Sequence, residues 1–160
     1  MKNIRLFMFV LVAISTLFVS CKKNDEKEAE KTPTDSYVAK TYQGTLVMSV
    51  GSSTYDPTNA EVILKGNGNN SVNITLPAVS GGMSQLPALT VKNVGVSTSD
   101  YKHFTLAETP IEQTVNDVHC SGKVSGSVAD GNLTLNYSVK PGEMPMSINF
   151  VFTTGANQAK

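Results

Sequence analysis

From residue 42 onward, apolar and polar residues alternate with a period of two, which is typical of strands that bury one face. The alternation comes in short runs, and turn residues separate each run from the next. The clearest runs cover residues 45–50, 60–65, 72–76, 120–128, 133–139 and 146–152, and further strands are expected near 89–96 and 103–107. The pattern therefore predicts an all-β domain of about eight strands.

Turn chemistry supports this division of the chain. The segment "GNGNN" at 66–70 and the pair Asp130–Gly131 predict hairpin turns, because Asn, Asp and Gly adopt positive φ at little cost. Two further stretches, 80–87 and 107–118, are expected to be loops. Evenly spaced strands favour a single antiparallel up-and-down barrel or a sandwich, and barrel closure removes exposed sheet edges.

The first residues have the character of an export signal. Lys2 and Arg5 precede an apolar run that is too short to span a membrane comfortably. Small Ser20 stands before Cys21, which resembles the bacterial lipobox, although the leucine usually found three residues before the cysteine lies one place further back, at Leu17. The resemblance implies that residues 1–20 are removed and that Cys21 carries lipid; secretion with a free thiol is the alternative.

The charged stretch after Cys21 has almost nothing apolar to bury, so residues 21–40 are expected to form a flexible tether. A lysine followed by acidic residues also resembles the surface-export signal of Bacteroidota lipoproteins. The expected organisation is thus signal peptide 1–20, tether 21–40, barrel 41–155 and a disordered tail at 156–160. The expected location is the outer membrane, on its periplasmic or cell-surface face, with the surface favoured.

Charge argues against nucleic acid as a partner. Removal of residues 1–20 leaves 11 basic side chains against 13 acidic ones, and the lysines are scattered rather than gathered into a patch. With Cys21 assigned to lipid, Cys120 has no cysteine left to pair with, so packing must stabilise the domain.

Three segments together resemble one family: "YQGTLVMSV", "ADGNLTLNYSV" and "KPGEMPMSINFVF". They are similar to the calycin-like, or lipocalin-like, β-barrel domain of Bacteroidota lipoproteins. The resemblance spans residues 42–153 and implies one barrel of about eight antiparallel strands. It also implies that a small hydrophobic molecule could bind inside, although fold alone does not fix function.

No reaction is predicted from these residues, and neither catalytic residues nor a metal or cofactor is expected. His119 and Cys120 are adjacent on a strand, so they point to opposite faces and cannot act as a base and its thiol. His103 and His119 lack a third metal ligand at a recognisable spacing. Glu108, Glu112 and Asp117 are expected in a solvated loop, with acid–base chemistry as a distant alternative.

The residues of inward parity are the candidate site, because they either fill the barrel or line a ligand cavity. They are Leu46, Met48, Val62, Leu64, Ile74, Leu133, Leu135, Tyr137, Ile148, Phe150 and Phe152. In a cavity, Tyr137 is the natural polar group to hold a ligand.

Two hypotheses follow, and both describe a non-catalytic, lipid-anchored outer-membrane protein. In the first, the barrel binds a small hydrophobic ligand. In the second, the barrel is solid and its loops, at 80–87 and 107–118, contact a protein or glycan partner. A hydrolase is the distant third, and the oligomeric state is left open.

Overall fold

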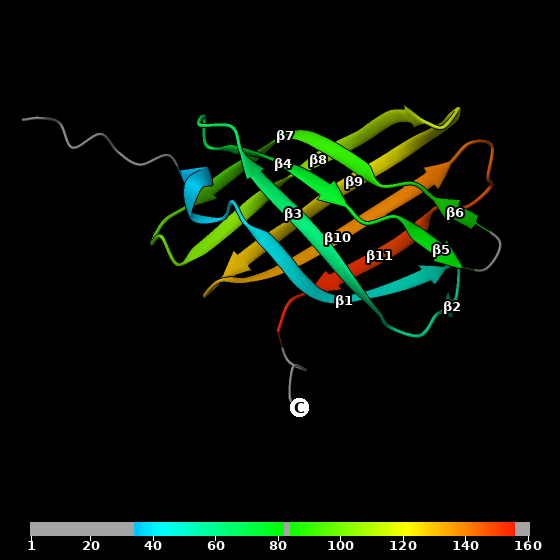
Figure 1. Cartoon of the computed structure of the whole chain (residues 1–160), viewed down its shortest axis with the longest axis horizontal. Coiled ribbons are helices and arrows are strands. Elements are labelled where there is room, and N and C mark those ends of the chain that lie inside the picture. Colours follow the sequence, from blue (N-terminus) through cyan, green and yellow to red (C-terminus); the bar gives the residue numbers. More distant parts are fainter. Residues whose placement is uncertain (1–33, 82–83, 156–160) are drawn as a thin grey trace, which may run out of the picture. The chain divides into compact units, whose positions relative to one another are not determined.

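A computed structural model describes residues 34–81 and 84–155, which belong to one compact unit, Thr32–Lys160. Its described part contains a 3₁₀ helix, η1 (Thr34–Tyr37), and eleven strands (Figure 1). The strands are β1 (Thr41–Val50), β2 (Ser53–Thr54), β3 (Thr58–Gly66), β4 (Ser71–Leu76), β5 (Val79–Gly81), β6 (Ser84–Leu86), β7 (Leu89–Thr98), β8 (His103–Val115), β9 (Val118–Ala129), β10 (Asn132–Pro141) and β11 (Ile148–Thr153). Among these residues, no helix is long and apolar enough to cross a membrane.

Strand β1 closes the sheet on itself. It pairs antiparallel with β3 through Thr41–Leu46 and with β11 through Thr45–Val50. The strand order β1-β3-β4-β7-β8-β9-β10-β11 then returns to β1, so eight strands of the described chain form a closed antiparallel barrel. The predicted fold is confirmed. Strand β2 adds to the end of β1, and β5 and β6 form a separate hairpin.

Positive-φ residues make the tight connections. Asp130 and Gly131 adopt φ of 48° and 80° in the predicted two-residue turn between β9 and β10. The 66–70 segment joins β3 to β4, also as predicted. A further turn of this kind, at Asn116 and Asp117 with φ of 51° and 62°, joins β8 to β9. Both hairpins suit the right-handed twist of their strands.

The two expected loops are wrong in different ways. Residues 107–115 continue β8, which pairs with β9 up to Val115, so the expected loop shrinks to the Asn116–Asp117 turn. The 80–87 stretch contains the pairing of β5 with β6. The last strand is also shorter than predicted, because it begins at Ile148 and Met146 is exposed.

Helix η1 covers one end of the barrel, which we call the η1 end. Residues 34–40, expected in the tether, contribute Val38, whose side chain is fully buried in the core. The carboxylate of Asp35, 2% exposed, accepts hydrogen bonds from the backbone N–H groups of Gly68 (2.7 Å) and Asn70 (3.1 Å). The Asp35 carbonyl oxygen accepts from the N–H of Val38 and Ala39. One acidic residue thus fastens the helix to the β3–β4 turn.

Replacing Asp35 with alanine is expected to lower the free energy of unfolding by about 2–3 kcal/mol, because the amides of Gly68 and Asn70 lose a charged acceptor. Urea denaturation measures the loss. The matched control is Asp56→Ala in the exposed segment before β3, expected to change stability by less than about 0.5 kcal/mol. Equal effects of the two changes would contradict the role assigned to Asp35.

Candidate functional site

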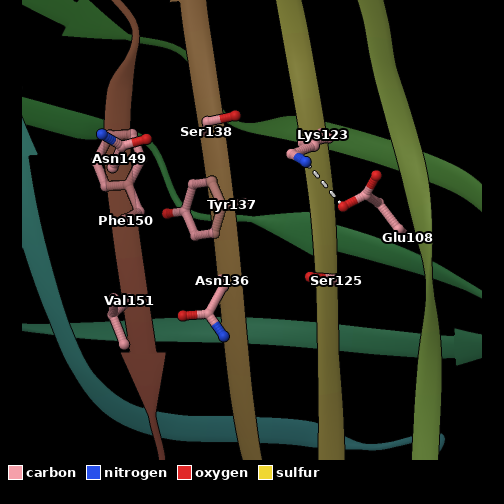
Figure 2. A pocket seen from close by; sticks show the side chains of 9 residues that line it. All are labelled: Glu108, Lys123, Ser125, Asn136, Tyr137, Ser138, Asn149, Phe150 and Val151. Atoms are coloured by element: carbon pink, nitrogen blue, oxygen red, sulfur yellow. Dashed lines mark hydrogen bonds and ion pairs between the residues drawn. The ribbon is translucent and has the colours of Figure 1, made fainter.

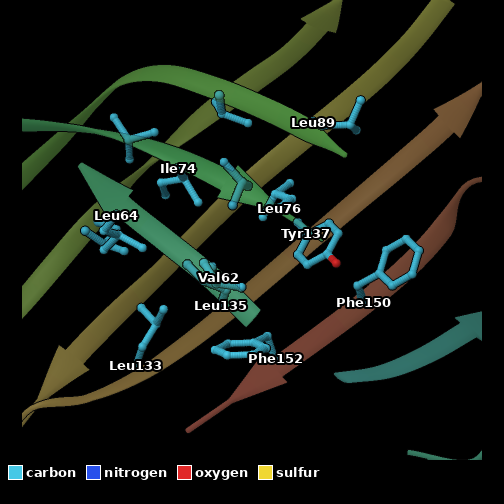
Figure 3. Close-up of a cluster of buried hydrophobic side chains, with 14 of the residues drawn as sticks. Val62, Leu64, Ile74, Leu76, Leu89, Leu133, Leu135, Tyr137, Phe150 and Phe152 are labelled. Carbon is cyan, nitrogen blue, oxygen red and sulfur yellow. The ribbon is translucent and has the colours of Figure 1, made fainter. Parts of the chain in front are cut away.

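The inward-parity residues form the core of the barrel (Figure 3). Ten of the eleven candidates are buried, and Met48 is half-buried and packs against the others. The rings of Tyr137 and Phe150 stack with centroids 4.6 Å apart. The parity prediction is therefore confirmed; whether these residues bind a ligand is a separate question, which depends on the space between them.

Very little space is left beside Tyr137 and Phe150. A cavity of about 10 Å³ lies between these rings and the β5–β6 hairpin, room for about one water molecule. Its walls include Val79 and Leu86 from that hairpin, together with Leu76 and Leu89 from β4 and β7. At this place the side chains fill the barrel rather than enclosing a pocket for an organic ligand.

The glycines on the inner face of β9 explain part of this filling. A Cβ added at Gly126 would lie 2.6 Å from Cδ2 of Leu135, and one added at Gly122 would collide with the backbone at Ser138. The neighbouring strand thus occupies the volume that larger side chains would need. These glycines allow close packing of β9 and β10, and they do not leave room for a ligand.

The hydroxyl of Tyr137 is a buried polar group without a hydrogen bond in the described structure. Burial raises the pKa of this hydroxyl. The hydroxyl of Tyr42 offers a contrast, because it is also buried but donates to the carbonyl oxygen of Val38 at 3.0 Å. Burial raises the pKa of Tyr42 to about 12.

Cys120 and His119 lie as their parity predicts. The Cys120 side chain is fully buried in the core, where desolvation raises the pKa of its thiol, and it forms no disulfide in the described chain. His119 is on the outer face, with Nε2 3.2 Å from Oε2 of Glu112. His103 pairs with Ala129 at the other end of the β8–β9 hairpin, far along the ladder from His119. No group of three metal-ligating side chains occurs in the described ranges.

The acidic residues expected in a loop are instead separated along β8 and its turn. Glu108 and Glu112 are exposed on β8, and Asp117 is exposed in the turn that follows. Each glutamate has its own partner: Glu108 accepts from Nζ of Lys123 at 2.9 Å, and Glu112 faces His119. The carboxylates therefore make ordinary surface pairs instead of converging as an acid and a base.

The outer face of β8 to β11 carries a polar depression of about 360 Å³ (Figure 2). Its outward side chains are short or polar, and they include Ser125, Asn136, Ser138 and Asn149. The Glu108–Lys123 pair lies at one side, and the exposed side chain of Val151 lies at the other. This surface was not predicted from the sequence, because its residues occupy the polar positions of alternating strands, which are ordinarily solvated.

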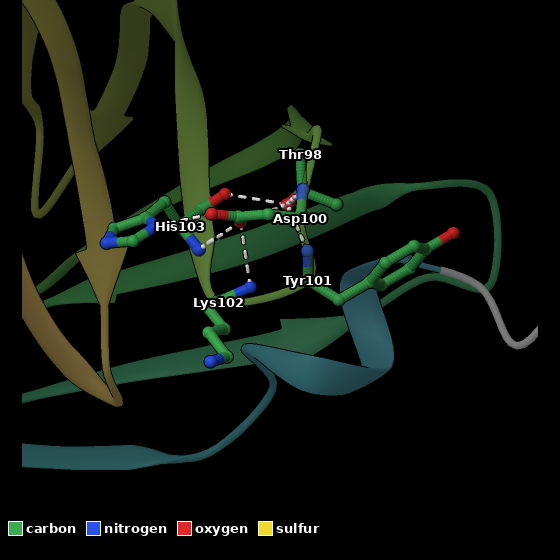
Figure 4. A network of polar contacts seen from close by, with 5 residues as sticks. All are labelled: Thr98, Asp100, Tyr101, Lys102 and His103. Atoms are coloured by element: carbon green, nitrogen blue, oxygen red, sulfur yellow. Dashed lines mark hydrogen bonds and ion pairs between the residues drawn. The ribbon is translucent and has the colours of Figure 1, made fainter.

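A second exposed feature lies at the η1 end, in the connection between β7 and β8 (Figure 4). The Asp100 carboxylate accepts hydrogen bonds from the backbone N–H groups of Lys102 (2.9 Å) and His103 (2.8 Å), and its Oδ2 is 2.6 Å from Nδ1 of His103. These contacts raise the pKa of His103 and hold that of Asp100 well below its usual range. Beside them, half-exposed Tyr101 packs on Tyr37, with centroids 5.4 Å apart.

These observations define a class: a closed antiparallel β-barrel whose described core is packed beside Tyr137 and Phe150, and whose depression of polar side chains lies on the outer face. The chain belongs to the calycin-like β-barrel family, whose Calycin-like beta-barrel domain matches residues 38–155. This match confirms the resemblance noted in the sequence. No curated protein matches the chain.

A crystal structure of a protein described as a "putative outer membrane protein", from Bacteroides fragilis, is similar to this chain. The two share 30% sequence identity and superpose with a TM-score of 0.70. The similarity covers 78% of this chain and 53% of that one, so this chain spans about half the length of the Bacteroides fragilis protein.

The two buried tyrosines provide a matched pair of substitutions. Tyr137→Phe removes a hydroxyl that has no protein partner, so stability is expected to stay the same or rise by up to about 1 kcal/mol. Tyr42→Phe removes a hydroxyl that donates to Val38, so a loss of about 1 kcal/mol is expected. Thermal and urea denaturation measure both, and a greater loss for Tyr137→Phe would show that its hydroxyl has a bound partner.

Proposed function

We propose that this chain is a non-catalytic binding module of the outer membrane, anchored through lipid on Cys21, which recognises a protein or glycan partner with the outside of its barrel. One observation carries the proposal. The core beside Tyr137 is packed down to a cavity of about 10 Å³, far below the roughly 300 Å³ at the lower end of small-molecule pockets. Recognition then falls to outward-facing residues.

The outer surface of the barrel offers suitable recognition features. The depression over β8 to β11 carries amides, hydroxyls and an ion pair, which are groups that hydrogen-bond to sugars and to peptide backbones. The Tyr37–Tyr101 pair adds exposed aromatic surface, which is enriched at interfaces. These features lie on hydrogen-bonded strands or beside a tight turn, so little ordering is needed on binding.

The location rests on different support. Similarity to the Bacteroides fragilis protein supports association with the outer membrane. The anchor rests on the apolar run ending at Cys21 and on the charged stretch after it, which lie outside the described residues. A lipid chain on the cysteine holds a protein at a membrane without a spanning helix. Export to the cell surface is the favoured orientation.

A second candidate function, binding of a small hydrophobic ligand, has one observation in its favour. Tyr137 lines the cavity beside the β5–β6 hairpin, and its buried hydroxyl has no partner among the described residues, which leaves it free to donate to a ligand. Such a ligand requires Val79 and Leu86 to move away from the cavity, because they form its walls. The packed state is therefore the better basis for a function.

Replacing Cys21 with serine is expected to move the protein from the membrane fraction to the soluble fraction, because the thiol that accepts lipid is lost. Cell fractionation and immunoblotting measure the distribution. Ser20→Ala is the matched control, since it keeps a small residue before the cysteine and should stay with membranes. Membrane association that survives Cys21→Ser would refute the anchor.

The packed interior predicts that benzene and laurate leave the melting temperature of the mature chain unchanged, because neither finds space inside. The control is Phe150→Ala, which opens an apolar cavity in the core and should gain thermal stability with benzene. Leu86→Ala is a milder second variant, should Phe150→Ala not fold. A clear rise for the unmodified core with laurate would favour the second candidate.

A further inference from the structure

The barrel wall is open between β7 and β8. Their ladder consists of three residue pairs near the η1 end, from Val96–Leu106 to Thr98–Phe104. Beyond these pairs, residues 89–95 of β7 and 109–115 of β8 have no ladder partner across the seam in the described structure, although β7 still pairs with β4 and β8 with β9. Two strand edges therefore face each other without ladder pairs between their backbones, and we call the space between them the seam cleft.

Local sequence explains why the ladder stops. In β7, Lys92 and Asn93 are both exposed and Asn93 has φ of 58°, which breaks the alternation and shifts the register with β4. In β8, the register with β9 shifts between Leu106 and Thr109. Such bulges bend strands and end pairing. Pro110 follows directly and has no N–H to donate, which suits a strand with a free edge.

The seam cleft has a volume of about 300 Å³ and two kinds of lining. Val91 and Ile111 are buried core residues and give it an apolar floor. Lys92 on the β7 side and Glu112 on the β8 side are exposed, so a basic and an acidic side chain stand on the two sides of the cleft; the Glu112 carboxylate also faces His119 at 3.2 Å. A molecule that binds in the seam cleft is therefore expected to have an apolar inner side, and an acidic and a basic group on its outer side.

Gln113 shows what kind of group the β7 edge accepts. Its side-chain carboxamide crosses the seam cleft: Oε1 accepts from the backbone N–H of Thr90 at 3.3 Å, and Nε2 donates to the Thr90 carbonyl oxygen at 3.4 Å. This pair of bonds is the one that a neighbouring strand makes with a residue in a sheet. The amide of Gln113 therefore takes the place of a peptide group, and long bonds of this kind are easily exchanged.

We infer that the seam cleft binds an extended peptide segment of a partner protein, which pairs with the free edge of β7 at Thr90 in place of the Gln113 amide. Backbone bonds supply much of the affinity in such strand addition, and alternate side chains supply specificity. The inward side chain of the segment packs on Val91 and Ile111, and outward acidic and basic side chains meet Lys92 and Glu112.

This inference rests on the proposed function and names its partner class, a peptide rather than a glycan. A glycan has no backbone amide row to match the edge of β7, whereas the cleft presents an unpaired edge, an apolar floor, and a basic and an acidic side chain on its two sides. Because β7 and β8 run antiparallel to each other, one strand between them is antiparallel to one edge and parallel to the other.

The test uses the full mature chain carrying Cys21→Ser, and the probe is a displayed library of random linear heptapeptides. Peptides that bind are expected to alternate apolar and polar residues, and to carry an acid and a base on the polar side. Their affinities are then measured by fluorescence anisotropy. In amide NMR spectra, the Thr90 N–H and the Gln113 side-chain NH₂ should shift upon binding.

Three variants separate backbone pairing from other contacts. Thr90→Pro removes the N–H that faces the cleft and should weaken binding by about tenfold or more, whereas Thr90→Val keeps that N–H and should bind normally. Gln113→Ala removes the internal competitor and should tighten binding severalfold.

Two results would overturn the inference: a library without binders, or binders equally tight on Thr90→Pro and Thr90→Val. Either result leaves the proposed function standing, because the Cys21→Ser fractionation and the benzene measurement test it separately.

Discussion

Strand β1 hydrogen-bonds to β3 through its first half and to β11 through its second half, and this double pairing closes the sheet. Closure fixes which side chains point inward on every strand, because alternate residues of a closed sheet face its interior. It also pairs the edges of β1 and β11 with each other, which would both be exposed in an open sheet. The packed core, the outward polar surface and the cover at the η1 end all depend on it.

Closure at eight strands leaves an interior that side chains can just fill. Large inward residues, such as Phe150 and Phe152, fill much of it. The glycines of β9 let β10 approach closely, because a larger side chain at either position would collide with β10. Beside Tyr137 and Phe150, packing of this kind leaves about 10 Å³, which is too little for an organic ligand. The seam between β7 and β8 is where the ladder stops, so the peptide site inferred above lies at a break in the sheet.

Much of the fold was predictable because the signals are local. Period-two alternation clearly marked six of the eight barrel strands, and Asp130–Gly131 marked a tight turn with the correct type of residue. The length of β8 was missed, because residues 107–118 were expected to be a loop. The strand nevertheless continues through Pro110, since a proline is tolerated where the neighbouring edge is unpaired. The Asn116–Asp117 turn was also missed, because no strand was expected directly before it.

Other features depend on contacts between distant residues and could not be predicted from local pattern. Asp35 reads as part of a charged tether, and only the fold brings it to the amides of Gly68 and Asn70. In the sequence, Gln113 has the character of an ordinary surface residue. Only the fold shows that its side chain bonds to Thr90 across the seam cleft. For the candidate site, parity placed Tyr137 and Phe150 correctly in the core, but the space left between them is a property of packing.

Native mass spectrometry tests most directly whether the barrel is filled by its own side chains. The mature chain carrying Cys21→Ser is purified without detergent from the cells that make it, so that any natural ligand has been available. The packed core predicts the mass of the bare polypeptide. A reproducible added mass that disappears on denaturation would mean that a ligand is bound. If Thr90→Pro and Thr90→Val retain this mass equally, the ligand does not depend on the seam cleft. Such a result would place the ligand inside the barrel and contradict a filled barrel.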